Sequence, residues 1–328
     1  MRAIQVSQDS KNPVLSMGEA EAPAMSPDEV RVEIKATAVN RADLMQARGA
    51  YPPPPGASEI LGLEMAGVIS ELGSHVSGWQ IGDRVAALLA GGGYAEEVVV
   101  HPDMLFRLPD SWSFAAGAAV PEVWLTAYVN LFLEGGLASG ETILIHAGGS
   151  GVGTAAIQLA RETGATPFVT AGSQAKLDAC QALGAQLMIN YKEADFQEAV
   201  ADATGGEGVN LILDPVGGAY LQKNISSLSR HGRMVVIGLL GGIKGELNIA
   251  QVLIKNLKIK GSTLRARPLS EKIEITQGFL SRFWPLFLDG TLKPVVDRTF
   301  PLNEAQAAHQ YVAENRNTGK VVLMVNGD

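Results

Sequence analysis

The stretch ILIHAGGSGVGTAAIQLA, residues 143–160, decides the fold of this chain. It opens with a continuous apolar run, crosses a cluster of glycines and continues as an amphipathic helical pattern. Glycine permits positive φ and close approach of the backbone to a ligand, while the free N–H groups and dipole of a helix N-terminus attract a pyrophosphate. The stretch therefore predicts a buried strand, a phosphate-binding turn and a helix.

The turn departs from the dinucleotide-binding template G-x-G-x-x-G at one position. Gly148 and Gly153 match the template, whereas Ser150 stands where the middle glycine is expected. A serine hydroxyl can still hydrogen-bond a phosphate, and Gly149 and Gly151 keep the turn flexible. A tight structural connection is the alternative, but the strand and helix patterns on both sides favour a dinucleotide site.

Strand and helix patterns alternate from about residue 121 onward. Fully apolar strands that alternate with helices indicate a parallel sheet covered on both faces. The fold class is therefore α/β, with a Rossmann-type, doubly wound parallel sheet in a domain that spans residues 121–293. The strands are predicted at 142–146, 167–172, 187–190, 209–214 and 233–240, and the helices at 153–164 and 174–184.

Residues 1–120 have a different character, with short strands joined by glycine- and proline-rich loops. Apolar and charged residues alternate over 30–36, which indicates a strand with one solvated face. The run PPPP at 52–55 marks a stiff loop. Residues 1–14 have no secretory h-region, and we expect a strand there.

A helix at about 304–315 and a terminal strand at 320–325 follow the alternating region. A strand this late in the chain, outside the strand–helix run, is expected to rejoin the first domain. The sequence thus predicts a mostly β domain built from residues 1–120 and 294–328.

The composition excludes several classes of protein. The net charge is −8 and the pI is near 5.3, which disfavours nonspecific binding to nucleic acid or to an anionic membrane. Cys180 is the only cysteine, so an intrachain disulfide and a cysteine-rich zinc lobe are both impossible. We expect no apolar run near the roughly 20 residues of a membrane span, and a cytoplasmic protein.

The end of the strand at 167–172 bears on which dinucleotide binds. NAD sites place an acidic residue there to bind the ribose 2′-hydroxyl. This chain has no acid at that point and offers instead Gly172, Ser173 and Lys176, with Tyr191 after the next strand. A hydroxyl and a cation suit a 2′-phosphate, and the sequence therefore predicts NADPH as the cofactor.

The whole chain resembles the medium-chain dehydrogenase/reductase superfamily. The resemblance rests on VNRADLMQARGAYPPPPG (39–56), ILGLEMAGVI (60–69), GDRVAAL (82–88), GGGYAEEVVV (91–100), AAVPEVWLTAY (118–128) and the glycine turn, in the family order. It implies a GroES-like first domain. NRADLMQ, VTAGSQAKL, VNLILDPVGG and GKVVL are similar to the tumour-suppressor-inducible quinone oxidoreductase branch, which also has a serine in place of the middle glycine.

Zinc dehydrogenases of this superfamily take a cysteine and a histidine as metal ligands from two N-terminal stretches. The first stretch here, residues 39–43, has no cysteine, and Leu63 stands at the histidine position beside Glu64. The five histidines show no ligand spacing, and we expect each to be structural or on the surface. The resemblance therefore implies an enzyme without zinc.

Two residues are expected, by resemblance, to line the substrate pocket. Asn40 is expected to donate a hydrogen bond to the carbonyl oxygen that gains charge, and Tyr51 to donate to the substrate or stack on it. The alternatives are that Asn40 caps a helix that starts at Arg41 and that Tyr51 only anchors the proline loop.

The resemblance also implies the residues that hold the cofactor. These are Thr126, Gly148, Ser150, Gly151, Val152, Gly153, Gly172, Ser173, Lys176, Tyr191, Leu239, Leu240, Gly241, Leu264 and Lys320.

The predicted function is zinc-independent hydride transfer from NADPH to a quinone or a similar electrophilic carbonyl. The alternatives are a 2-alkenal or enone reductase and a non-catalytic NADPH-binding protein. The stretch NLKIKGSTL (256–264) is predicted to be an edge strand. The family pairs such edges, so a homodimer is expected, with a tetramer as the alternative.

Overall fold

The computed structural model describes residues 1–7 and 12–325, and the chain divides into two compact units. The first unit comprises Met1–Leu125 and Leu264–Asp328, and the second comprises Thr126–Thr263.

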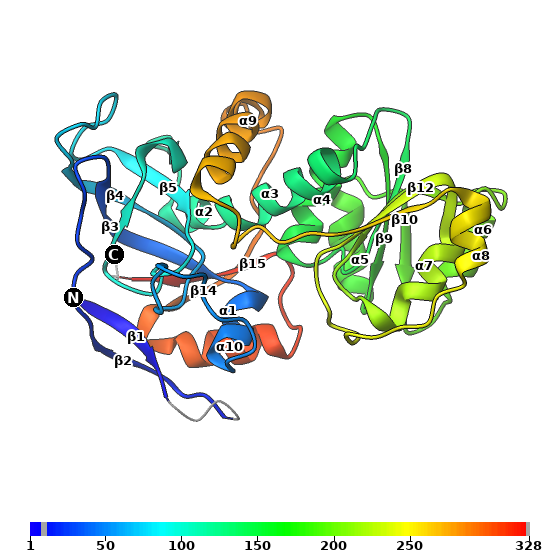
Figure 1. The fold of residues 1–328 in the computed structure, drawn as a ribbon, viewed down its shortest axis with the longest axis horizontal. Helices are drawn as coiled ribbons and strands as arrows, with labels where there is room; N and C mark the ends of the chain where they lie inside the picture. The colour runs from blue at the N-terminus through cyan, green and yellow to red at the C-terminus, as the bar shows by residue number, and fades with distance from the viewer. Residues whose placement is uncertain (8–11, 326–328) are drawn as a thin grey trace. The chain divides into compact units, whose positions relative to one another are not determined.

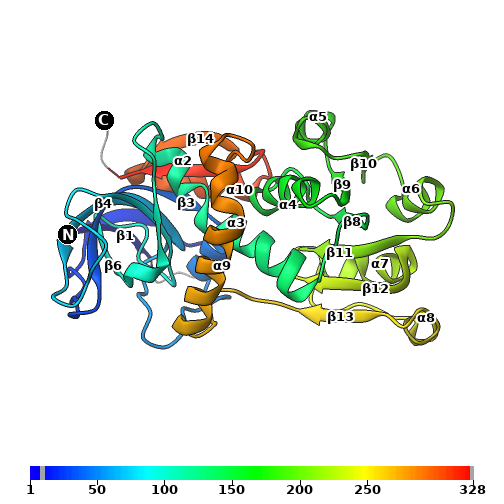
Figure 2. The ribbon, with the colours of Figure 1, turned by 90° about the horizontal axis from the view of Figure 1, so that it is seen from above.

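The second unit is built on a six-stranded sheet in the order β10-β9-β8-β11-β12-β13. Every neighbouring pair in this sheet is parallel, as the apolar strands of the sequence predict (Figure 2). The strands are β8 (Thr142–Ile145), β9 (Thr166–Ala171), β10 (Leu187–Asn190), β11 (Val209–Asp214), β12 (Leu228–Val236) and β13 (Lys258–Gly261).

Helices cover both faces of this sheet. Figure 2 shows α4 (Gly151–Glu162) and α5 (Gln174–Leu183) on one face and α6 (Phe196–Ala203) and α7 (Leu221–Ser227) on the other. The helix α8 (Ile249–Lys255) lies beside α7, and the short η3 (Gly218–Tyr220) precedes α7. This arrangement is the doubly wound α/β fold that the sequence predicts.

The strand order places a topological switch at β8. From β8 the chain moves to β9 and β10 on one side, and it then returns to β11 on the other side. Ligands of open parallel sheets bind outside the carboxyl ends of the strands at such a switch. The glycine turn that follows β8 therefore occupies the position at which this fold binds ligands.

One predicted strand ends earlier than expected. The sequence predicts a strand over 233–240, but β12 ends at Val236, and Leu239 and Leu240 are exposed in a loop. The apolar run misled the prediction because these two leucines continue it past the last residue that pairs with β13.

The first unit contains a seven-stranded sheet and a two-stranded ribbon of β1 (Arg2–Val6) and β2 (Leu15–Glu19) (Figure 1). The late strand lies inside this sheet, because β15 pairs antiparallel with β3. The predicted N-terminal strand is β1; residues 8–11 of the predicted stretch lie outside the described residues. The strands of the sheet are β3 (Val30–Val39), β4 (Glu64–Leu72), β5 (Arg84–Leu88), β6 (Glu97–Val100), β7 (Leu105–Arg107), β14 (Val296–Pro301) and β15 (Lys320–Met324).

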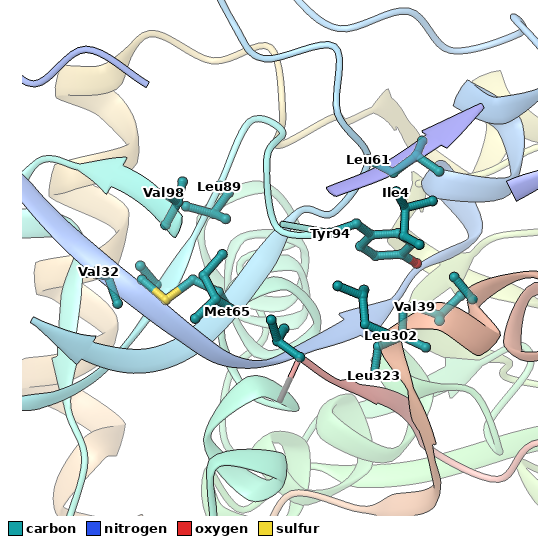
Figure 3. Close-up of a cluster of buried hydrophobic side chains, with 14 of the residues drawn as sticks. Ile4, Val32, Val39, Leu61, Met65, Leu89, Tyr94, Val98, Leu302 and Leu323 are labelled. Carbon is teal, nitrogen blue, oxygen red and sulfur yellow. The ribbon is translucent and has the colours of Figure 1, made fainter. Parts of the chain in front are cut away.

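The core of the first unit contains apolar side chains from segments that lie far apart in the sequence. Figure 3 shows the ring of Tyr94 among Ile4, Leu61 and Leu302. Each of these side chains is at most 2% exposed. Full burial of one such side chain contributes about 1.5–3 kcal/mol. The helices around this sheet are α1 (Arg41–Ala47), α2 (Phe114–Ala118), α3 (Pro121–Tyr128) and α10 (Ala305–Ala313), with the short η1 (Pro102–Met104) and η4 (Leu302–Glu304).

The long helix α9 (Leu269–Leu288) belongs to the first unit, although the sequence analysis assigns its residues to the second domain. Its aromatic side chains account for the difference. Phe287 packs edge-on against Trp124 with ring centroids 4.5 Å apart, and Phe279 lies 6.0 Å from Phe106. These contacts anchor residues 264–293 to the β-rich unit.

One apolar stretch is longer than the sequence analysis expects. Among the residues that the structure describes, Phe114–Glu134 alone is long and apolar enough for a membrane span, at 21 residues. Its most apolar window is 83% buried inside the protein, which is the behaviour of a core helix. It includes α3 and the π-helix η2 (Val129–Glu134).

Candidate functional site

The glycine turn after β8 is closely packed and requires its glycines. A Cβ atom at Gly153 would lie 2.5 Å from the carbonyl oxygens of both Ala147 and Gly148. A Cβ at Gly148 would lie 2.9 Å from the Cβ of Val169 on β9. Side chains at these positions would push α4 away from the strand it follows, so the turn brings a helix N-terminus directly to the carboxyl end of β8.

Ser150 begins the helix α4. Its Oγ accepts a hydrogen bond of 3.0 Å from the Gly153 backbone N–H, the usual contact of an N-cap serine. The hydroxyl hydrogen is still available as a donor. Gly151 and Val152 form the first turn, in which backbone N–H groups have no partner inside the helix. The turn therefore presents donors suited to a phosphate.

Four residues that are predicted to favour NADPH over NADH lie near the ends of β9 and β10. A Cβ at Gly172 would lie 2.5 Å from the Tyr191 hydroxyl oxygen, so this hydroxyl rests against the Gly172 backbone. The side chain of Lys176 packs on the glycine turn, because a Cβ at Gly149 would lie 3.1 Å from its Cδ. Ser173 is exposed at the N-cap of α5.

The loop after β12 lies along the loop after β11. The backbone N–H of Gly241 donates to the Val216 carbonyl at 2.7 Å, and that of Leu240 donates to the Pro215 carbonyl at 3.2 Å. In the loop after β11, the Asp214 carboxylate accepts a hydrogen bond of 2.7 Å from the Val216 backbone N–H. Burial raises the pKa of this carboxyl. Leu239, Leu240 and Gly241 are thereby held at the carboxyl end of the sheet.

Thr126 is buried in α3, one turn before the π-helix η2. Its carbonyl accepts a hydrogen bond of 2.7 Å from the Asn130 side-chain amide. Single turns of π-helix occur often at functional sites.

The remaining predicted residues, Asn40, Tyr51, Leu264 and Lys320, lie in the first unit. Lys320 and Glu64 form a buried ion pair of 2.7 Å, with side chains 4% and 0% exposed. The Lys320 ammonium also donates to Asn40 Oδ1 at 2.6 Å and to the Val39 carbonyl at 3.1 Å. The other Glu64 oxygen accepts from the Glu122 backbone N–H at the start of α3, at 2.8 Å. Both oxygens of the buried Glu64 carboxylate therefore have partners, one the Lys320 ammonium and the other a backbone N–H group.

Asn40 is the N-cap residue of α1, which begins at Arg41 as one of the two sequence hypotheses predicts, and its backbone N–H donates to the Asp43 side chain. Its side chain has other partners. Its amide donates to Glu64 Oε1 at 2.9 Å and to the Ala38 carbonyl at 3.3 Å, and its oxygen accepts from Lys320. Both amide hydrogens are thus directed at protein oxygens, and Asn40 joins Lys320 to Glu64.

A second set of buried polar groups continues from Asn40. Asp43 accepts from the Asn40 backbone N–H at 2.7 Å and from Gly62 N at 3.1 Å. Burial raises the pKa of Asp43 to about 6 despite these two donors. The Tyr94 hydroxyl lies 2.9 Å from His309 Nε2, and burial lowers the pKa of His309 to about 4. These groups are held in place around the sheet and α10.

Tyr51 is half-buried and contacts Arg265. The Arg265 guanidinium carbon lies 5.4 Å from the centroid of the Tyr51 ring, and its Nη1 donates to the Tyr51 carbonyl at 3.3 Å. Burial raises the pKa of the Tyr51 phenol, and the charge of Arg265 opposes this rise. Leu264, the residue before Arg265, is buried.

Asp43 and Arg265 were not predicted from the sequence, and Glu64 was noted only as the residue beside Leu63, where a single carboxylate does not make a zinc site. One signal in the sequence could have identified them, namely charged residues within otherwise apolar stretches. Fully buried charges are rare unless they are paired, so such residues indicate buried polar contacts. Within residues 1–7 and 12–325, no three His, Cys, Asp or Glu side chains gather closely enough to hold a metal ion.

Two family profiles match this chain. The profile described as an alcohol dehydrogenase GroES-like domain matches residues 26–110, and the profile described as a zinc-binding dehydrogenase matches residues 151–279.

Two solved structures are similar over nearly the whole chain. The Escherichia coli quinone oxidoreductase complexed with NADPH is 30% identical, with a TM-score of 0.87, and the alignment covers 99% of this chain and 100% of that one. The CurK enoyl reductase is 30% identical, with a TM-score of 0.84 and 99% of each chain covered.

A third similarity is to much longer proteins. The phenolphthiocerol synthesis polyketide synthase Pks15/1 of Mycobacterium marinum is 37% identical over 308 residues, which are 93% of this chain and 14% of that protein. The chain spans between 8% and 18% of the length of this and the other polyketide synthases that it matches.

The buried ion pair predicts a large and specific loss of stability. Lys320→Met should lower the free energy of unfolding by about 3–5 kcal/mol, because it leaves the Glu64 carboxylate buried without its cation. Lys320→Met/Glu64→Gln should recover much of this loss, because the double variant buries no charge. Denaturant titration measures both.

The exposed pair of Arg2 and Glu96 provides the control, and Arg2→Met should cost less than about 1 kcal/mol. A Lys320→Met variant no less stable than this control would contradict the assignment.

Proposed function

Because the chain belongs to the medium-chain dehydrogenase/reductase superfamily of oxidoreductases, we propose that it transfers a hydride from NADPH to a quinone without the help of zinc. The observation that carries the proposal is the contact of the Lys320 ammonium with Glu64 and Asn40. By resemblance, Asn40 and Glu64 lie in the two stretches that supply metal ligands in zinc dehydrogenases. An internal cation at this point would repel a metal ion and removes the need for one to balance Glu64.

Zinc independence limits the acceptor. Without a Lewis acid to polarise an alcohol or an unactivated carbonyl, the acceptor must already be electrophilic. Quinones and conjugated carbonyl compounds meet this requirement. The similarity to the Escherichia coli quinone oxidoreductase supports a quinone as the first candidate.

NADPH, when bound, supplies the hydride, and the second unit supplies the binding groups. We propose that Gly148, Ser150, Gly151, Val152 and Gly153 bind the pyrophosphate through the donors of the turn. Ser173, Lys176 and Tyr191 would bind the 2′-phosphate beside Gly172, and no acidic residue follows β9 to repel it. Further contacts are proposed, by resemblance, for Thr126, Leu239, Leu240, Gly241, Leu264 and Lys320.

In the first unit, we propose that Tyr51 contacts the acceptor, by donating from its hydroxyl or by stacking on a flat ring. The role proposed for Asn40 is to position groups rather than to donate, because both of its amide hydrogens reach protein oxygens. Water would protonate the reduced product.

The second candidate function is reduction of the C=C bond of a conjugated enoyl compound. It uses the same hydride chemistry. It is favoured by the similarity to the CurK enoyl reductase and by the 37% identity to a polyketide synthase.

We also propose that the second unit pairs with a second copy of the chain. The edge strand β13 is exposed along its length. In α8, the helix that precedes β13 in the chain, Ile249, Leu253 and Ile254 are 73%, 75% and 72% exposed. An exposed strand edge flanked by large apolar side chains is a site of association, and a two-fold axis would cover both copies.

The assignment of Lys176 to the 2′-phosphate predicts a change in cofactor preference. Lys176→Ala should weaken NADPH binding about tenfold or more, because a charge-assisted hydrogen bond is lost, and should leave NADH binding nearly unchanged. Titration with each reduced cofactor, followed by nicotinamide fluorescence, measures both. Equal weakening of the two would remove Lys176 from the phosphate site.

The proposed reaction predicts NADPH oxidation with an acceptor panel. Wild-type protein should oxidise NADPH with 1,4-benzoquinone or with a conjugated enal, and the ratio of kcat/KM for the quinone to kcat/KM for the enal distinguishes the two candidate functions.

Asn40→Ala should reduce turnover of the acceptor, while NADPH affinity stays within about twofold of the wild type. Binding of NADPH with no turnover on any acceptor would favour a non-catalytic protein. Zinc measured at one equivalent in the active sample would refute zinc independence.

The proposed association through β13 and α8 predicts that a substitution on α8 lowers the mass of the assembly in solution. Leu253→Glu should convert a dimer into a monomer in sedimentation velocity, because it introduces a charge into the apolar face. Glu198, exposed on α6, provides a matched control as Glu198→Gln, which should leave the mass unchanged. A wild-type monomer would overturn the proposal.

A further inference from the structure

Arg265 is a buried cation with no carboxylate partner. It is 5% exposed, and all three of its hydrogen bonds reach neutral oxygens. Nε donates to the Ala90 carbonyl at 2.8 Å, Nη1 to the Tyr51 carbonyl at 3.3 Å and Nη2 to Gln46 Oε1 at 2.8 Å. No carboxylate lies within 4.0 Å of its nitrogens among the residues that the structure describes.

The remaining donors of Arg265 suit an oxyanion. A guanidinium carries five N–H groups in a planar fork, and three of them are used here, which leaves one on each Nη atom. Paired N–H groups of this kind bind carboxylates and phosphates in bidentate fashion. A charge buried without an ionic partner is costly, and perturbed ionisable groups of this kind occur often at functional sites.

A second cation lies near the first. Lys272 is half-buried in the first turn of α9, and burial followed by the charge of Arg265 lowers the pKa of its ammonium. No hydrogen bond or ion pair of this ammonium is found in the described part of the chain. The charges of Arg265 and Lys272 thus reinforce each other and would both attract an anion.

The acidic groups nearby are already engaged. Asp43 attracts Arg265 electrostatically, but its two oxygens accept from Asn40 N and Gly62 N. Glu271, next to Lys272, pairs with Arg267. Neither carboxylate forms an ion pair with Arg265 or Lys272.

Tyr51 connects this pair to the reaction. It is the residue proposed to contact the acceptor, and its ring lies beside the Arg265 guanidinium. We infer that Arg265 and Lys272 form an anion-binding subsite, and that the acceptor this protein reduces carries an oxyanion, a carboxylate or a phosphate, as well as its electrophilic group. This inference rests on the proposed reductase function and names its substrate class.

A matched pair of acceptors tests the subsite. (E)-6-Oxohept-4-enoate carries a carboxylate that two methylene groups separate from its conjugated ketone, and its methyl ester has the same conjugated ketone without the charge. Wild-type protein should reduce the carboxylate with at least about tenfold higher kcat/KM than the ester, mainly through KM. A preference for the ester, or equal rates, would overturn the inference while leaving the reductase function established.

Substitutions of Arg265 and Lys272 test whether these two residues cause the preference for the carboxylate acceptor. Lys272→Met and Arg265→Lys should each lower kcat/KM for the carboxylate about tenfold and leave the ester within about twofold. Lys272 has no partner to lose, so this variant should fold even if Arg265→Lys does not. Lys293→Met, at an exposed position in the same unit, removes one positive charge as Lys272→Met does, and should change kcat/KM for neither acceptor.

Two further readouts separate the sources of the anion. Inorganic phosphate that competes with the carboxylate acceptor more strongly than acetate does would indicate a phosphate-bearing substrate, and the reverse would indicate a carboxylate. The NADPH affinity of Lys272→Met should equal that of the wild type. A loss of NADPH affinity with unchanged acceptor kinetics would assign the cations to the cofactor and overturn the inference.

Discussion

The buried contact of Lys320 with Glu64 is the interaction on which the first unit depends. The three residues it joins come from neighbouring positions of one sheet: Lys320 from β15, Asn40 from the end of β3 and Glu64 from the start of β4. A carboxylate at 0% exposure is tolerable only if its charge is met on all sides, and the ammonium, the Asn40 amide and the start of α3 meet it. The register observed between β15, β3 and β4 brings these groups together around the carboxylate.

The two units solve different physical problems. The second unit offers an anion backbone groups. Its glycines bring a helix N-terminus to the end of β8, where backbone N–H groups attract an anion without any side-chain charge. The first unit uses side chains, and places buried cations and a phenol around the sheet. Backbone donors suit a group common to every turnover, such as a pyrophosphate. Side chains are the means by which one member of a family comes to differ from another in its substrate.

How far the sequence could predict these features depended on the distance over which each is encoded. The glycine turn and its flanking strand and helix are local, and the pattern around Gly148 and Gly153 predicts them with correct types. The role of Asn40 is not local, because its side-chain partners arrive from Glu64 and from Lys320, which is 280 residues away. The unit to which α9 belongs was not predicted, and Phe287 shows why: it packs against Trp112 and Trp124, which are far away in the sequence. Arg265 was missed because an isolated arginine in a loop is usually solvated, and only its burial marks it.

The order of synthesis gives the late position of Lys320 a consequence. The second unit is one continuous segment, Thr126–Thr263, and a ribosome completes it before the end of the chain emerges. The first unit cannot be completed then, because Glu64 has been made but its cation has not. Until β15 arrives, the nascent β-sheet must leave this carboxylate in water, since burying it uncompensated is costly. The formation of the first unit therefore waits for Lys320: a chain truncated before this residue would contain the complete second unit and a first unit whose Glu64 carboxylate has no cation.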